Sequence, residues 1–214
     1  MEKVPAMLAP MLEGLGITLE VFMITLAIAL PLGLVLALAR ISKYKPLSFV
    51  VETYIWLMRG TPLMLQLLFV YYALPSVGIK MSDMTAALLA FSLNYAAYFA
   101  EIFRSGIQSI ERWQYEAAKC LGFSYIQTMR RIIIPQMIKR VLPPISNETI
   151  TLVKDTSLIY VLAMNDLLRV ARSIVQREFD MTPFIIAGIF YLGMTLILTA
   201  IFKNMEKKYA AYDE

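Results

Sequence analysis

Five long apolar segments limit what this chain can fold into. Each has about 20 residues or more, which is enough for a helix to cross a hydrocarbon core of roughly 30 Å. Because the segments are continuously apolar and do not alternate, a transmembrane barrel is disfavoured. The chain is therefore expected to be one all-α integral membrane domain over residues 1–214, with five transmembrane helices. The expected spans are residues 17–39, 47–75, 84–107, 143–164 and 183–202.

Charged residues make up only 17% of the chain and gather between the apolar segments. If the N-terminus lies outside, most Lys and Arg residues fall on the cytoplasmic side, above all in residues 108–140, here called the polar loop. The positive-inside rule favours this orientation, with the C-terminus in the cytoplasm. Contact of the basic segments with anionic lipid explains the net charge of +4, so no nucleic-acid partner is expected.

Histidine is absent, and Cys120 is the only cysteine. The chain thus lacks the commonest metal ligand and the usual general base, and it cannot form an intrachain disulfide. It also lacks the Gly-rich phosphate loop that ends in Lys and Ser or Thr. No catalytic residue, metal site or bound cofactor is expected.

The polar loop lies between the third and fourth apolar segments. Its residues 113–121 predict a short helix that ends at Gly122, a residue suited to a left-handed cap. Ser124 and Gln127 have the spacing of a capping box and predict a second helix, which Pro135 should interrupt. Small residues at the tip would let a partner surface approach closely, although the same pattern also fits a plain solvated loop.

Four short motifs follow one another along the chain. Residues 59–63 read Arg-Gly-Thr-Pro-Leu, and residues 98–107 read Tyr-Phe-Ala-Glu-Ile-Phe-Arg-Ser-Gly-Ile. Residues 116–122 read Glu-Ala-Ala-Lys-Cys-Leu-Gly, with Ile-Pro at 134–135, and residues 154–158 read Lys-Asp-Thr-Ser-Leu. The third motif resembles the EAA signature of permease subunits in bacterial ABC importers. The others are similar to motifs of the polar amino-acid uptake subfamily, and the resemblance covers nearly the whole chain.

The resemblance implies a type I ABC importer permease in the bacterial inner (cytoplasmic) membrane, with a coupling helix in the polar loop. Transport would be driven by an ABC ATPase dimer, a separate pair of chains that binds ATP and Mg, so this chain would not be an enzyme by itself. An extracytoplasmic amino-acid-binding protein would deliver the solute. A second permease subunit is also implied; a homodimer is preferred because nothing marks an asymmetric partner, and a related second chain stays open. The expected ATPase-coupling residues are Glu116, Ala117, Ala118, Leu121 and Gly122.

Polar residues inside the spans mark the expected substrate path, because such groups usually face the bundle interior or a water-filled cavity. Helical spacing puts Asn94, Tyr98 and Glu101 on one face of the third span. Asp155 shares a face of the fourth span with Glu148 and lies at a depth similar to that of Asn94. The expected substrate-binding residues are Met64, Leu67, Asn94, Tyr98, Glu101, Asp155, Thr156 and Ser157.

Several of these residues have a structural alternative. Glu101 could pair with Arg104, and Thr156 and Ser157 could satisfy backbone carbonyls where the helix is irregular. Arg59 stands beside the break expected at Thr61-Pro62, where it could bind a carboxylate. For this orientation, a basic anchor at the cytoplasmic interface is the preferred interpretation of Arg59.

The acids at Glu101, Glu148 and Asp155 predict a basic solute, such as arginine, lysine or histidine, that moves by alternating access. If Arg104 or Lys154 already balances these acids, glutamine or another neutral amino acid fits as well.

Two functions of other kinds remain as alternatives, a passive channel and a membrane-embedded hydrolase that uses Ser157. The hydrolase lacks histidine and a nucleophile-elbow motif. Residues 165–177 predict an external amphipathic helix, which either rests on the outer mouth and meets the binding protein or lies among lipid headgroups.

Overall fold

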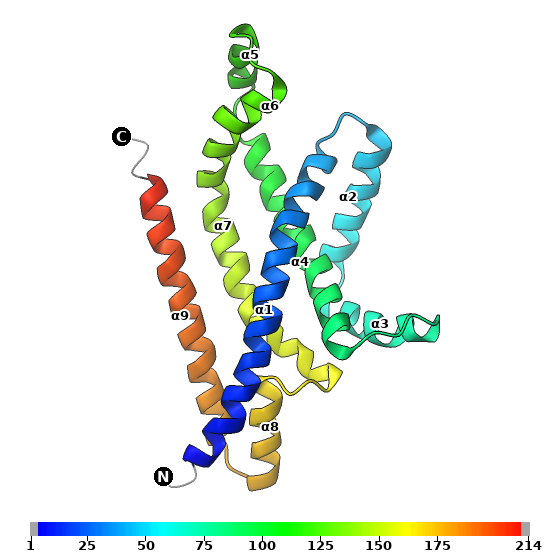
Figure 1. The fold of residues 1–214 in the computed structure, drawn as a ribbon, viewed down its shortest axis with the longest axis vertical. Helices are drawn as coiled ribbons and strands as arrows, with labels where there is room; N and C mark the ends of the chain where they lie inside the picture. Colours follow the sequence, from blue (N-terminus) through cyan, green and yellow to red (C-terminus); the bar gives the residue numbers. More distant parts are fainter. Residues whose placement is uncertain (1–3, 211–214) are drawn as a thin grey trace.

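The computed structural model describes residues 4–210, and its regular elements in this range are all helical. Residues 1–3 and 211–214 of the expected domain lie outside the described residues. Figure 1 shows long helices that run side by side, with α3 projecting sideways. In chain order the elements are α1 (Val4–Arg40), α2 (Lys45–Gly60), α3 (Leu63–Ser76), α4 (Asp83–Gln108), α5 (Arg112–Cys120), α6 (Tyr125–Thr128), a π-helical turn (Met129–Ile133), α7 (Ile134–Asp155), a 3-10 segment (Thr156–Leu162), α8 (Leu167–Glu178) and α9 (Thr182–Ala210).

Helix α4 lies at the centre of the bundle and packs against α1, α2, α3 and α7. Its inner positions are rich in alanine, and small residues let neighbouring helices approach closely. A Cβ atom on Gly33 of α1 would lie 2.7 Å from the Cβ of Phe99, and one on Gly106 would lie 2.2 Å from Cγ1 of Val141 in α7. These two glycines therefore set how closely α1 and α7 pack against α4.

Within residues 4–210, three helices are long and apolar enough to cross a membrane, namely α1, α4 and α9. Helices α2 and α3 qualify only together, as a pair bent by 105°. The expected count of five spans is not confirmed, because the fourth apolar segment is not one long apolar helix. It comprises the charged C-terminal half of α7 and the 3-10 segment, which follows Asp155 directly.

The bend between α2 and α3 occurs where the sequence predicts a break, at Thr61-Pro62. Both residues have extended backbone angles, which proline favours for itself and for the residue before it. The side-chain amide of Gln66 donates to the backbone oxygen of Met58 at 2.9 Å and to Oγ1 of Thr61 at 2.7 Å. Gln66 thus satisfies groups that the broken helix leaves unpaired and fixes the direction in which α3 leaves the bundle.

The polar loop occupies one end of the bundle, and α8 and the start of α1 occupy the other (Figure 1). Gly122 has the positive φ of +79° that a left-handed cap requires, and the expected capping box of Ser124 and Gln127 is present. The prediction that Pro135 interrupts the second helix is wrong. Pro135 stands in the first turn of α7, where its missing N–H costs little, and the preceding π-helical turn keeps the backbone helical.

Helix α8 packs against the rest of the protein. Its buried side is formed by Leu167, Ala171 and Ile174, which contact Met7 and Met11 of α1. The spacing of Leu168, Ala171 and Val175 in the sequence predicts an apolar face for this helix, and the observed buried face is displaced from it by one residue at each end. Because the apolar side is covered by protein, it is not available to anchor the helix in lipid headgroups.

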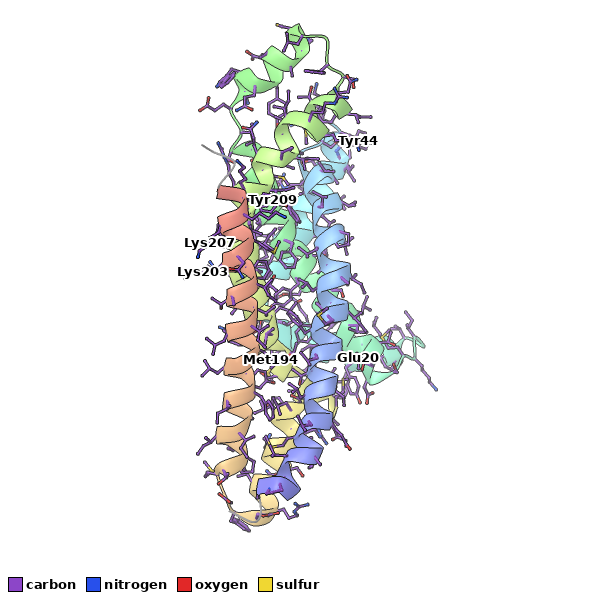
Figure 2. All side chains as sticks on the ribbon, turned by 60° about the vertical axis from the view of Figure 1, so that its left-hand side comes forward. Glu20, Tyr44, Met194, Lys203, Lys207 and Tyr209 are labelled. Carbon is purple, nitrogen blue, oxygen red and sulfur yellow. The ribbon has the colours of Figure 1, made fainter. Side chains whose placement is uncertain are left out.

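Helix α9 packs on α7 and α8 but exposes most of its apolar surface. In the single chain, only 6% of the most apolar stretch of α9 is buried. In Figure 2, Met194 faces the bundle, whereas Lys203 and Lys207 lie on the outer edge near the polar-loop end. A helix with this exposed apolar surface is suited to contact with lipid or with another subunit.

Candidate functional site

A cavity of about 640 Å³ opens where the α2–α3 bend faces α4 and α7. Its size falls within the range of roughly 300–1,000 Å³ that is usual for small-molecule sites. Four of the expected substrate-binding residues lie on its wall: Met64, Asn94, Tyr98 and Asp155. We call it the outer cavity, because it lies farther from the polar loop than its neighbour. It is also lined by Arg59, Tyr95, Glu148, Thr151 and Leu158, among others.

A second cavity of about 540 Å³, the inner cavity, lies between the outer cavity and the polar loop. The expected site residue Glu101 lines this cavity. Glu101 is engaged by Arg104, whose Nε donates to Oε2 of Glu101 at 2.9 Å and whose second terminal nitrogen pairs with Oε1. The structural alternative for Glu101, a partner for Arg104, is present in this structure.

Three expected site residues do not line either cavity. Leu67 is fully buried in the core, because the bend turns this side of α3 toward α4. Thr156 is fully buried as well, and its Oγ1 donates to the backbone oxygen of Val153 at 2.7 Å. Ser157 donates in the same way to Lys154 at 2.7 Å. Both hydroxyls therefore satisfy carbonyls where α7 gives way to the 3-10 segment, as their structural alternative proposed.

Asn94 lines the outer cavity but already makes hydrogen bonds within the protein. Its Nδ2 donates to the backbone oxygen of Met58 at 3.0 Å and to Oε1 of Gln66 at 2.9 Å. The side chain is 3% exposed. Asn94 thus ties the α2–α3 bend to α4 and shapes the cavity wall.

Asp155 has a partner that the sequence analysis missed. The phenol of Tyr95 donates to Oδ2 of Asp155 at 2.7 Å, which joins the middle of α4 to the end of α7. A buried tyrosine hydroxyl usually needs an acceptor, so Tyr95, beside Asn94 in an apolar span, was the available signal. The hydrogen bond orients the carboxylate through Oδ2, and the other oxygen, Oδ1, takes no part in it.

Arg59 lies at the end of α2, directly before the bend, and lines both cavities. Its guanidinium carbon lies 5.3 Å from the centre of the Tyr98 ring, a cation–π geometry. The preferred interpretation of Arg59 as a basic interface anchor is therefore wrong, since the side chain turns into the cavities. The sequence placed Arg59 next to the break but could not give the direction of the bend.

The polar loop forms a small unit with a core of its own. Ile110, Met129 and Ile133 are buried together, and Tyr115 packs against them, which raises its pKa by burial. Ala118 is 1% exposed and belongs to the interior of this unit, so the proposal that it contacts a partner directly is not supported. The other expected coupling residues, Glu116, Ala117, Leu121 and Gly122, are exposed.

Large apolar side chains near the loop tip include three that were not singled out in the sequence, Trp113, Tyr125 and Ile126. Together with the expected coupling residue Leu121 they are between 60% and 76% exposed, although polar residues surround them. An exposed apolar patch of this kind marks an interaction surface. The tip therefore combines small, charged and apolar groups on one end of the molecule.

Comparisons with known proteins agree with this architecture. The chain matches the family described as binding-protein-dependent transport system inner membrane component over residues 29–211. It is 44% identical to the probable amino-acid ABC transporter permease protein YckA of Bacillus subtilis, over 94% of this chain and 89% of that protein. It is 41% identical to the arginine transport system permease protein ArtQ of Bacillus subtilis, over 94% and 93%.

Other similarities point the same way. The putative glutamine transport system permease protein GlnP of Rickettsia bellii is 34% identical, over 92% of this chain and 91% of that protein. A crystal structure of an amino acid ABC transporter with histidines superposes with a TM-score of 0.86 at 36% identity, covering 94% of each chain. In such transporters the permease is not itself the enzyme, and the ATPase is a separate chain. The chain therefore belongs to the inner-membrane components of binding-protein-dependent transport systems, as a permease subunit similar to those of amino-acid ABC importers.

Proposed function

We propose that this permease carries a basic amino acid, such as arginine, lysine or histidine, into the cytoplasm by alternating access. The observation that supports it most is the pair of carboxylates on the outer cavity, Asp155 and Glu148. Arg59 is the one Lys or Arg side chain on that wall, so the cavity alone carries a negative balance. A cationic side chain supplies the charge that such a cavity needs.

Two of the relatives agree with a basic solute. One is named as an arginine transport system permease protein, and a solved relative is described with histidines. Other relatives are named for glutamine and L-cystine, so glutamine or another neutral polar amino acid is the second candidate. The hydrogen bond from Tyr95 and the charge of Arg59 favour that candidate, because both reduce the need of the acids for a cation.

The assembly that fits this function has two permease subunits, an ABC ATPase dimer that binds ATP and Mg, and an external amino-acid-binding protein. The polar loop then lies in the cytoplasm, where its exposed Leu121 and Gly122 contact the ATPase. The N-terminus lies outside and the C-terminus inside. The chain crosses the membrane five times, with α7 and the 3-10 segment as the fourth crossing.

The experiment is ligand-stimulated ATPase activity of the complete complex in proteoliposomes, with arginine and glutamine tested in parallel. If Asp155 holds the side-chain charge of the solute, Asp155→Asn abolishes the stimulation by arginine but keeps the basal ATPase activity and the assembly. Tyr95→Phe is the matched control, because it removes the same hydrogen bond and leaves the carboxylate in place. A wild-type complex that prefers glutamine, or an Asp155→Asn complex with normal arginine stimulation, contradicts the basic solute. Ligand-independent flux without ATP in the wild type indicates a passive channel.

A further inference from the structure

The outer and inner cavities share a stretch of wall, here called the shared wall, that is formed by three side chains. Arg59, Tyr98 and Glu148 line both cavities, and they come from α2, α4 and α7. Everything else on the two walls belongs to one cavity or the other. A solute that moves from the outer cavity toward the polar loop therefore passes these three residues.

Two of these side chains, Arg59 and Tyr98, contact each other at the shared wall. The guanidinium lies over the aromatic face at 5.3 Å from the ring centre, so the two side chains meet across the space between α2 and α4. Arg59 carries a charge that a solute must displace, and Tyr98 carries a bulky ring. The contact is directional, because a cation is attracted to the face of the ring and not to its edge.

The charges along the path form an ordered series. Asp155 lines the outer cavity, Glu148 lines both, and Glu101 lines the inner cavity. Glu101 is occupied by Arg104. Arg59 and Glu148 both line the two cavities, so a base and an acid lie where the cavities adjoin. The positive charge of Arg59 occupies the place that a cationic solute would take there.

At the position of Arg59 the side chain, and not the helix, is the part that is able to move. Arg59 belongs to the last turn of α2, and the break at Thr61-Pro62 and the 105° bend follow immediately. The backbone beside Arg59 is held, because Nδ2 of Asn94 and Nε2 of Gln66 donate to the backbone oxygen of Met58 at 3.0 Å and 2.9 Å. The side chain of Arg59 is exposed, so a change of rotamer withdraws the guanidinium from the ring while α2 and α4 stay in place.

We propose that Arg59 and Tyr98 form the inner latch of the transporter, which separates the outer cavity from the polar-loop side as long as the guanidinium lies over the ring. The latch rests on the proposed importer function, but it does not depend on which amino acid is carried. Releasing it opens the path past Glu148, and closing it restores the cation–π contact.

The test measures leakage through the complete complex, with the binding protein present and ATP absent. Proteoliposomes are loaded with radiolabelled arginine or, in parallel, glutamine, and efflux of each is followed. Tyr98→Leu should speed the efflux by about three- to thirty-fold, the factor that corresponds to the loss of one cation–π contact. Tyr98→Phe is the matched control, because it keeps the aromatic face and should stay within about twofold of the wild type.

A second variant tests the other side of the latch. Arg59→Gln should leak as Tyr98→Leu does, and the double variant should leak no more than either single variant, because both changes break one contact. Sealed vesicles with both single variants overturn the proposal, as does a double variant whose leak is the product of the two. Leakage of glutamine but not of arginine keeps the latch and contradicts the basic solute, so failure of the proposed solute class is distinguishable from failure of the latch.

Discussion

At the scale of single residues, Asp166 shows how burial and capping compete. It is fully buried at the start of α8, where its carboxylate accepts the backbone N–H groups of Leu168 at 3.0 Å and Arg169 at 3.2 Å. Burial raises the pKa of its carboxyl from 3.8 to about 6, although these hydrogen bonds and the charge of Arg169 oppose the rise. The native protein thus binds this proton more tightly than the unfolded chain does.

The raised pKa of Asp166 predicts a loss of stability as the pH rises. Between pH values of about 4 and 6 the unfolded chain releases the proton first, so the free energy of unfolding falls, by about 3 kcal/mol for a shift of this size. Above about pH 6 both states are ionised and the contribution is constant. Asp166→Asn keeps an acceptor for the cap and carries no charge, so it should remove this slope.

Thermal unfolding in detergent checks the prediction for Asp166. The unfolding temperature of Asp166→Asn minus that of the wild type should grow from about pH 4 to pH 6 and then stay level. Asp166→Ala serves as the control for the cap, because losing the acceptor costs about 1 kcal/mol on its own. A difference that does not change with pH shows that the carboxyl titrates as it does in the unfolded chain.

Gly106 marks the closest approach of α4 and α7. A Cβ atom there would lie 2.2 Å from Cγ1 of Val141, so Gly106→Ala should destabilise the protein by about 1–3 kcal/mol. Val141→Ala removes the clashing methyl group, and the double variant should recover part of that loss. Gly16→Ala is the control, because nothing lies within 4 Å of its Cβ position, and it should be neutral or stabilising. Unfolding measured in denaturant tests these variants, and a stable Gly106→Ala protein contradicts the close approach.

At the scale of helices, local signals in the sequence predicted where helices end and how they are capped, but not the direction in which the chain continues after a break. The capping box at Ser124, the left-handed Gly122 and the break at Pro62 depend on neighbouring residues only, and they are present. The angle of 105° at that break depends on packing, because Asn94 of α4 donates to Met58 on one side of the break and to Gln66 on the other. For this reason the sequence could not show that Arg59 turns inward.

The candidate site was predicted in part for the same reason. Helical spacing brought Asn94, Tyr98 and Asp155 to one cavity, because a helix face follows from sequence alone. It could not show that Leu67 lies on the covered side of α3, nor that Tyr95 reaches Asp155 over 60 residues of chain. Contacts between helices need the tertiary structure.

The polar loop carries a prediction about coupling. Ala117 is exposed on α5, whereas Ala118 belongs to the interior of the loop. Ala117→Arg should therefore leave the permease folded and lower ATP-driven uptake by roughly tenfold or more, because a long charged side chain prevents close approach of a partner. Ala117→Ser keeps a small side chain and should transport normally. Uptake and co-purification of the ATPase measure the effect, and normal uptake by Ala117→Arg contradicts the docking assignment.

At the scale of the whole molecule, the single chain leaves surfaces that a membrane protein of this kind would not leave to lipid. The outer cavity holds the half-buried acids Asp155 and Glu148, and a charge at mid-membrane costs about 3 kcal/mol when it faces hydrocarbon. A second permease subunit that covers the cavity mouth removes this cost.

The structure thus predicts a pair of permease subunits, and the two possible pairs give different results. When tagged and untagged copies of this chain are expressed together in equal amounts without any related permease, a homodimer that pairs at random carries the untagged copy through purification at about half the amount of the tagged copy. The measurement is the ratio of the two copies after solubilisation, with copies mixed only after solubilisation as the control for exchange. The homodimer is contradicted if this chain is monomeric without a related permease and dimeric when one is present. That result identifies a heterodimer of two related chains. Monomers in both cases contradict the pairing itself, and the acids of the outer cavity would then have to be neutralised within one chain.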